Sequence, residues 1–167
     1  SISGAYKNSI FPQMENCKSF KFNDPENLEM NIIECEKKGG VYAVIIEPYS
    51  ASMLEACSEK FITKLNELKK KYTFNIICDE VFSGFFKSNE MFYFQNFSNF
   101  EPDTICLSKV LGGGKSSISA LVVNEDVYKK AYGKLKNKRD VIFKNDPNSK
   151  ELSKLDFYIL QLKKRMI

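Results

Sequence analysis

The sequence contains no histidine, no CxxC pair and no long apolar run. Without histidine, a Ser-His-Asp or Cys-His catalytic relay, a His-ligated metal and a zinc site with two histidines are all excluded. General acid and base chemistry would therefore have to use Lys, Asp, Glu, Tyr or Cys side chains.

The cysteines also argue against a metal site, because they are dispersed and have no histidine partners. Several of them lie within apolar runs, which predicts reduced cysteines in the core of a cytoplasmic protein. The longest apolar run, residues 41–46, is far shorter than the roughly 20 residues that span a bilayer, and no leader pattern is present. We therefore expect a soluble protein with no membrane partner. The five cysteines are Cys17, Cys35, Cys57, Cys78 and Cys106.

The positive charge is concentrated in the C-terminal part of the chain. The whole sequence has 25 basic and 21 acidic residues, and residues 134–167 alone hold 10 basic and 4 acidic residues. Residues 1–133 are therefore slightly acidic. We interpret residues 134–167 as a solvated basic tail with one amphipathic helix, and we expect no nucleic-acid partner.

The order of the expected elements is typical of an α/β domain with a mostly parallel sheet flanked by helices. Asp24 and Pro25 predict a helix start and Gly39-Gly40 its end, and Ser58 predicts the cap of a second helix with an apolar face. The first expected strand is a continuous β-branched run, which predicts burial on both faces. The expected strands are residues 41–46, 74–78, 103–107 and 118–123.

Reactive side chains follow three of these strands. Glu47-Pro48 follows the first strand, Asp79-Glu80 the second, and Ser108-Lys109 the third, directly before three glycines. Active sites of parallel sheets form at the carboxyl ends of the strands. An acid and a lysine on neighbouring strand ends are therefore a plausible reactive pair.

Gly114-Lys115-Ser116 is similar to the end of a phosphate-binding loop of an ATPase. That motif requires a glycine five residues before Gly114, and this position is occupied by Lys109. The loop would also have to precede the acidic strand, whereas here it follows it. We therefore reject the interpretation of this sequence as an ATPase.

Residues 41–128 resemble the central part of a class III aminotransferase, a pyridoxal-phosphate (PLP) enzyme of fold type I. The matching stretches are Val44-Ile-Ile-Glu-Pro48, Ile76-Ile-Cys-Asp-Glu-Val-Phe-Ser-Gly-Phe85 and Pro102-Asp-Thr-Ile-Cys-Leu-Ser-Lys-Val-Leu-Gly-Gly-Gly114. The resemblance implies that residues 1–133 form part of the PLP-binding large domain of that fold.

The resemblance also implies roles for four residues. Lys109 corresponds to the lysine that forms the Schiff base with PLP and then carries the proton between the substrate and the cofactor. Asp79 corresponds to the carboxylate that pairs with the pyridine nitrogen and keeps the ring cationic. Val81 corresponds to an apolar residue stacked on the ring, and Phe82 stands beside the cofactor, where many relatives have glutamine.

Some departures from the family pattern leave alternatives open. Ser50-Ala-Ser52 replaces a Gln-Gly-Glu segment, and Lys87 replaces an arginine. Phe82 stands at a position where the glutamate-1-semialdehyde aminomutase branch also has a residue other than glutamine. The expected activity is transamination between an amino donor and an oxo-acid or aldehyde acceptor. The alternatives are an aminomutase and a non-catalytic fragment or degenerate relative.

The resemblance carries two further expectations about the whole protein. The family's phosphate-binding segment and small C-terminal domain have no counterpart in this sequence, so we expect a truncated chain with weak or no turnover by itself. We expect a homodimer for a full-length relative, because the family dimerises through the large domain.

Overall fold

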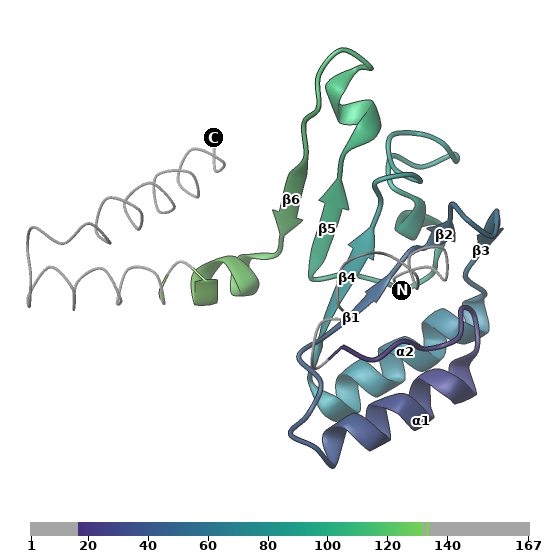
Figure 1. Cartoon of the computed structure of the whole chain (residues 1–167), viewed down its shortest axis with the longest axis vertical. Coiled ribbons are helices and arrows are strands. Elements are labelled where there is room, and N and C mark those ends of the chain that lie inside the picture. The colour runs from purple at the N-terminus through teal and green to yellow at the C-terminus, as the bar shows by residue number, and fades with distance from the viewer. Residues whose placement is uncertain (1–16, 132, 134–167) are drawn as a thin grey trace, which may run out of the picture. The chain divides into compact units, whose positions relative to one another are not determined.

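The computed structural model describes residues 17–131 and 133 (Figure 1). The chain divides into two compact units, residues 1–122 and 123–167. In the second unit, residues 125–131 are helical. The helix predicted within residues 134–167 lies outside the described residues.

The two long helices begin where the sequence predicts caps. Helix α1 spans Pro25–Glu36, and the Asp24 side chain accepts a hydrogen bond from the Asn27 N–H at 2.9 Å. Helix α2 spans Glu59–Tyr72, and Ser58 Oγ accepts a hydrogen bond from the Phe61 N–H at 3.2 Å. Each cap satisfies a backbone donor that the helix itself leaves without a partner.

The main sheet has the strand order β1-β4-β5-β6. Strands β1, β4 and β5 are parallel, and Figure 1 shows β6 running opposite to β5. A short antiparallel pair, β2 and β3, follows β1. The fold is thus α/β with a mostly parallel sheet and flanking helices, as the sequence predicts. The strands are β1 (Ala43–Ile46), β2 (Tyr49–Ser50), β3 (Glu55–Ala56), β4 (Asn75–Asp79), β5 (Thr104–Leu107) and β6 (Ala120–Val123).

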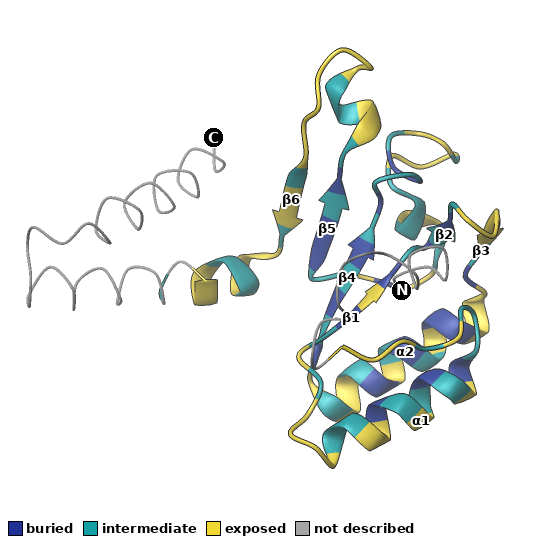
Figure 2. Ribbon diagram, in the orientation of Figure 1, coloured by how far each residue is buried: buried dark blue, intermediate teal, exposed yellow. Residues whose placement is uncertain are grey.

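The core lies between the two helices and one face of the sheet (Figure 2). Its centre is formed by Phe61, Leu65 and Ile76, which are each at most 1% exposed. Ile45 of β1, in contrast, is 49% exposed. The prediction that this strand is buried on both faces is therefore wrong within the described residues, because α1 and α2 cover only the face that Val44 and Ile46 share.

The cysteines differ in their surroundings, although all five are free thiols. Cys57 and Cys78 are buried, as predicted for core residues, and burial raises the pKa of the Cys57 thiol to about 12. Burial also raises the pKa of the Cys78 thiol. Cys17 is exposed, so the prediction of a core position is wrong for this residue, which precedes the first helix.

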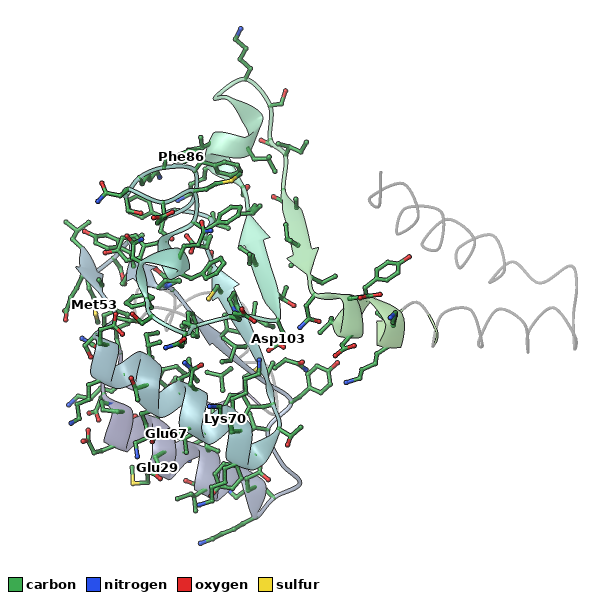
Figure 3. The ribbon with its side chains drawn as sticks, turned by 180° about the vertical axis from the view of Figure 1, so that it is seen from behind. Glu29, Met53, Glu67, Lys70, Phe86 and Asp103 are labelled. Atoms are coloured by element: carbon green, nitrogen blue, oxygen red, sulfur yellow. The ribbon has the colours of Figure 1, made fainter. Side chains whose placement is uncertain are left out.

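Asp103 fixes the position of the strands relative to helix α2. Its Oδ2 accepts hydrogen bonds from Lys69 Nζ at 2.6 Å and from the Ile76 N–H at 2.7 Å, and its own N–H donates to the Ile76 carbonyl. Asp103 lies just before β5 (Figure 3). These contacts hold β4 and β5 in the register that brings their carboxyl ends together.

Within residues 17–131 and 133, no helix combines the length and the apolar character needed to cross a membrane. The described residues also contain no group of three or more Cys, Asp or Glu side chains placed to hold a metal ion.

Candidate active site

The carboxyl ends of β1, β4 and β5 meet at one edge of the sheet. The register pairs Ile46 with Cys78 and Asp79 with Cys106. The segments that begin at Glu47, Glu80 and Ser108 therefore leave the sheet side by side. The sequence predicted this grouping from the strand ends alone.

Asp79 is half-buried at the end of β4 and is oriented by its own loop. Its Oδ1 accepts a hydrogen bond from the Val81 N–H at 3.0 Å. Among the described residues, none donates a hydrogen bond to the second carboxylate oxygen. One oxygen thus fixes the side chain, and the other is available to a ligand.

Glu80 has a structural role that the sequence left open. The side chain is fully buried, and both carboxylate oxygens accept hydrogen bonds: Oε2 from Ser83 Oγ at 2.6 Å and Oε1 from the Phe94 N–H at 2.8 Å. Gly84 packs so closely that a Cβ atom there would lie 2.9 Å from the Glu80 carbonyl oxygen. Glu80 therefore anchors the loop that follows Asp79.

Glu47, the other acidic residue at this edge, is also used by the backbone. Its Oε2 accepts a hydrogen bond from the Ala51 N–H at 2.9 Å, and its carbonyl accepts one from Cys57 Sγ at 3.5 Å. These contacts stabilise the turn that carries β2 and β3. They give Glu47 a structural role.

Lys109 is exposed and begins a short 3-10 helix, η3 (Lys109–Gly112), directly after β5. Its φ is +46°, a left-handed conformation that is uncommon for residues with a side chain. Among the described residues, no ion pair joins Lys109 to Asp79 or to any other carboxylate. The lysine and the aspartate therefore stand at neighbouring strand ends without neutralising each other.

Two positively charged side chains lie over the Phe82 ring. Lys109 Nζ lies 5.4 Å and Lys87 Nζ 4.1 Å from the ring centroid. A cation is attracted to the negative face of an aromatic ring at such distances. Phe82 therefore positions the Lys109 amine, which is a more specific contact than the sequence suggested.

Two tyrosines belong to the same edge, although sequence reasoning missed both. The Tyr49 ring stacks on Phe82 with centroids 6.3 Å apart, and the Tyr93 ring lies 5.2 Å from Tyr49. Tyr49 directly follows Glu47-Pro48 at the end of β1, so its place in the sequence could have predicted that it lies at this edge of the sheet. Tyr93 begins a short 3-10 helix, η2 (Tyr93–Asn96), far along the chain from Tyr49, and had no such signal.

Comparison with known proteins now decides the family. Residues 1–136 match the family described as Aminotransferase class-III. The chain belongs to the class III aminotransferase family.

Solved transaminases share the fold of this class III chain. A transaminase solved with L-ala is 31% identical, with a TM-score of 0.56, over 62% of this chain and 24% of its own. An ornithine aminotransferase from Plasmodium yoelii is 30% identical, with a TM-score of 0.56, over 63% of this chain and 27% of its own. An omega transaminase from Pseudomonas jessenii, in complex with PMP, is 28% identical, with a TM-score of 0.57, over 65% of this chain and 25% of its own. The chain thus spans about a quarter of the length of these transaminases.

Class III aminotransferases imply PLP, and the described residues fit its ring and its aldehyde. Asp79 offers a carboxylate oxygen that no described residue engages, and Lys109 offers an amine without an ion-pair partner. Val81 and Phe82 are half-buried beside them and supply apolar surface. Asp79, Val81, Phe82 and Lys109 are therefore the residues of this class III chain that could hold the cofactor.

The backbone of Lys109 permits a direct test of its strained conformation. Glycine adopts a positive φ without the steric cost of a Cβ atom. We expect the Lys109→Gly variant to exceed Lys109→Ala in free energy of unfolding by about 1 kcal/mol, measured by urea denaturation with far-UV circular dichroism.

Lys70 provides the matched control for this comparison. It is exposed on α2, so Lys70→Gly should be less stable than Lys70→Ala by about 1 kcal/mol, the opposite order. Equal stabilities of Lys109→Gly and Lys109→Ala would show that the positive φ carries no strain.

Proposed function

We propose that this chain carries the cofactor-attachment site of a PLP-dependent aminotransferase, which moves an amino group from an amino donor to an oxo-acid or aldehyde acceptor. The observation that supports this most strongly is the placement of Lys109 and Asp79. The two lie at adjacent ends of parallel strands, and no ion pair joins them in the described part of the chain. The family match gives this arrangement its chemical meaning.

Each proposed residue has a chemical role that its position supports. PLP, when bound, supplies the electron sink that accepts the negative charge developing at the substrate's Cα. The Lys109 amine would hold the aldehyde carbon and would move the proton away from the substrate's Cα. The Asp79 carboxylate stabilises a proton on the ring nitrogen, and Val81 and Phe82 orient the ring and exclude water from its faces.

The activity of the whole enzyme involves more than this chain. Because the chain spans about a quarter of the length of the transaminases it matches, we propose that it shows weak or no turnover by itself. A homodimer at full length and a cytoplasmic location remain predictions that follow from the family and from the reduced cysteines. No observation favours the aminomutase reaction over transamination.

Reductive trapping tests the attachment site without requiring turnover. The chain is incubated with PLP and reduced with borohydride, and the modified lysines are mapped by mass spectrometry. We expect the label on Lys109, and its loss from that position in Lys109→Arg. Lys70→Arg is the control, since Lys70 projects from α2, well away from the loop that carries Phe86 (Figure 3).

A label distributed over many lysines, with no preference for Lys109, would contradict the proposed function. A separate, unreduced mixture of the chain with PLP receives an amino donor, with and without an oxo acid, and separates the two reactions. A transaminase requires the acceptor for a second turnover, whereas an aminomutase does not.

A further inference from the structure

An open pocket of about 420 Å³ lies between Lys109 and the loop that leads into β6. Two successive glycines with positive φ, Gly113 (+59°) and Gly114 (+73°), turn the chain back at this point. The N–H groups of Lys115 and Ser116 both donate to the Gly112 carbonyl, at 3.1 and 3.3 Å, and hold the turn closed. The pocket is lined by Ser108, Lys109, Gly114, Lys115 and residues 116–119.

The lining of this pocket is positively charged and rich in hydroxyl groups. It contains two lysines and four serines, and no carboxylate. Among the described residues, no ion pair involves Lys109 or Lys115, and no described residue hydrogen-bonds the hydroxyls of Ser116 or Ser117. Ammonium and hydroxyl donors without protein acceptors favour an anionic ligand.

The position of the pocket indicates which anion it accepts. Lys109 lines it, whereas Asp79, Val81 and Phe82 do not. A molecule in the pocket would therefore contact Lys109 from a side that does not include the residues proposed to hold the cofactor ring. An anionic molecule bound there would place its charged group near Lys115.

We propose that Lys115, with the hydroxyls of Ser116 and Ser117, binds the carboxylate of the amino acid or oxo acid that reacts at the carbon held by Lys109. This assignment rests on the proposed function, because it takes Lys109 as the reacting amine. It makes Lys115 a specificity-determining residue, which favours substrates with a carboxylate over neutral amines and aldehydes. It also gives a role to the Gly114-Lys115-Ser116 segment, which resembles the end of an ATPase phosphate-binding loop but does not complete that motif.

The test compares an anionic and a neutral aldehyde as labels for Lys109. Glyoxylate or propanal condenses with the Lys109 amine, water leaves as the C=N bond forms, and added cyanoborohydride supplies the hydride that reduces the bond to a stable secondary amine. The rate at Lys109 is followed by mass spectrometry. We expect the preference for glyoxylate over propanal to fall about tenfold in Lys115→Met.

Lys70→Met is the matched control, since it removes another exposed charge, outside the pocket, and should leave the preference unchanged. The preference should also fall as the salt concentration rises, because the pocket is open to solvent. An unchanged preference in Lys115→Met, with an unchanged circular dichroism spectrum, would overturn the proposal.

A second arm distinguishes the substrate's carboxylate from the cofactor's phosphate. The Lys109 adduct is trapped with PLP and with pyridoxal, which lacks the phosphate. If Lys115→Met lowers the yield with PLP but not with pyridoxal, Lys115 serves the cofactor and the proposal is overturned. An unchanged yield with both reagents supports it.

The two arms also separate this inference from the proposed function. PLP labelling at Lys109 together with a glyoxylate preference independent of Lys115 would overturn only the carboxylate site. A preference that depends on Lys115, without any PLP adduct at Lys109, would support the anion site and contradict the aminotransferase assignment.

Discussion

The Asp79→Asn variant is expected to form product about 100-fold more slowly than the parent chain in a single turnover with stoichiometric PLP and an amino donor. Loss of an opposite charge beside a titrating nitrogen lowers that nitrogen's pKa by about one to three units, and each unit is a factor of ten in the protonated fraction. The measured quantity is the oxo acid released per chain with time.

Asparagine is the informative substitution, because its side-chain oxygen can still accept the Val81 N–H bond at the position of Asp79 Oδ1. The fold should therefore be retained, and the loss should be specific to the chemistry. Asp126→Asn removes an exposed carboxylate outside the site and should leave the rate unchanged. A rate within threefold of the parent value for Asp79→Asn would rule out the proposed role of Asp79.

Glu80→Ala is expected to have the largest effect on stability, a loss of about 3 kcal/mol in the free energy of unfolding. The substitution removes the acceptors of the Ser83 hydroxyl and the Phe94 N–H and leaves a cavity where a fully buried side chain stood. Buried donors without partners and cavities each cost of the order of 1–3 kcal/mol. Urea denaturation followed by tyrosine fluorescence and far-UV circular dichroism measures this loss.

Two further variants define the origin of that loss. Glu80→Gln retains an acceptor for the Phe94 N–H and can accept or donate toward Ser83, so it should lose less than half as much stability. Glu90→Ala removes an exposed carboxylate from the same loop and should change stability by less than about 0.5 kcal/mol. A loss below 1 kcal/mol in Glu80→Ala would show that the loop does not depend on this carboxylate.

The local signals in the sequence were sufficient for most of the fold. Asp24 and Ser58 predict the two helix starts, because a short polar side chain before an apolar helical pattern satisfies a free N–H group whatever surrounds it. The strand ends at Asp79 and Lys109 were predictable for a similar reason. Parallel strands align their carboxyl ends, so residues after each strand come together once the sheet is recognised.

Burial was harder to predict, because it depends on which face of an element is covered. The β-branched run that contains Ile45 has the composition of a strand buried on both sides, yet α1 and α2 cover only the alternate positions. Composition reports that a side chain is apolar, and only the packing of other elements decides whether it is shielded from water.

By itself, the sequence determined the fold class, the edge of the sheet where the site lies, and the presence of a lysine and a carboxylate there. The tertiary structure decided how these groups are held. It assigned Glu80 to the loop rather than to the site, brought Tyr49, Lys87 and Lys109 around the Phe82 ring, and gave Lys109 a left-handed backbone. Strand positions and helix caps follow from local patterns, whereas contacts between side chains of separate loops depend on the paths of those loops in space.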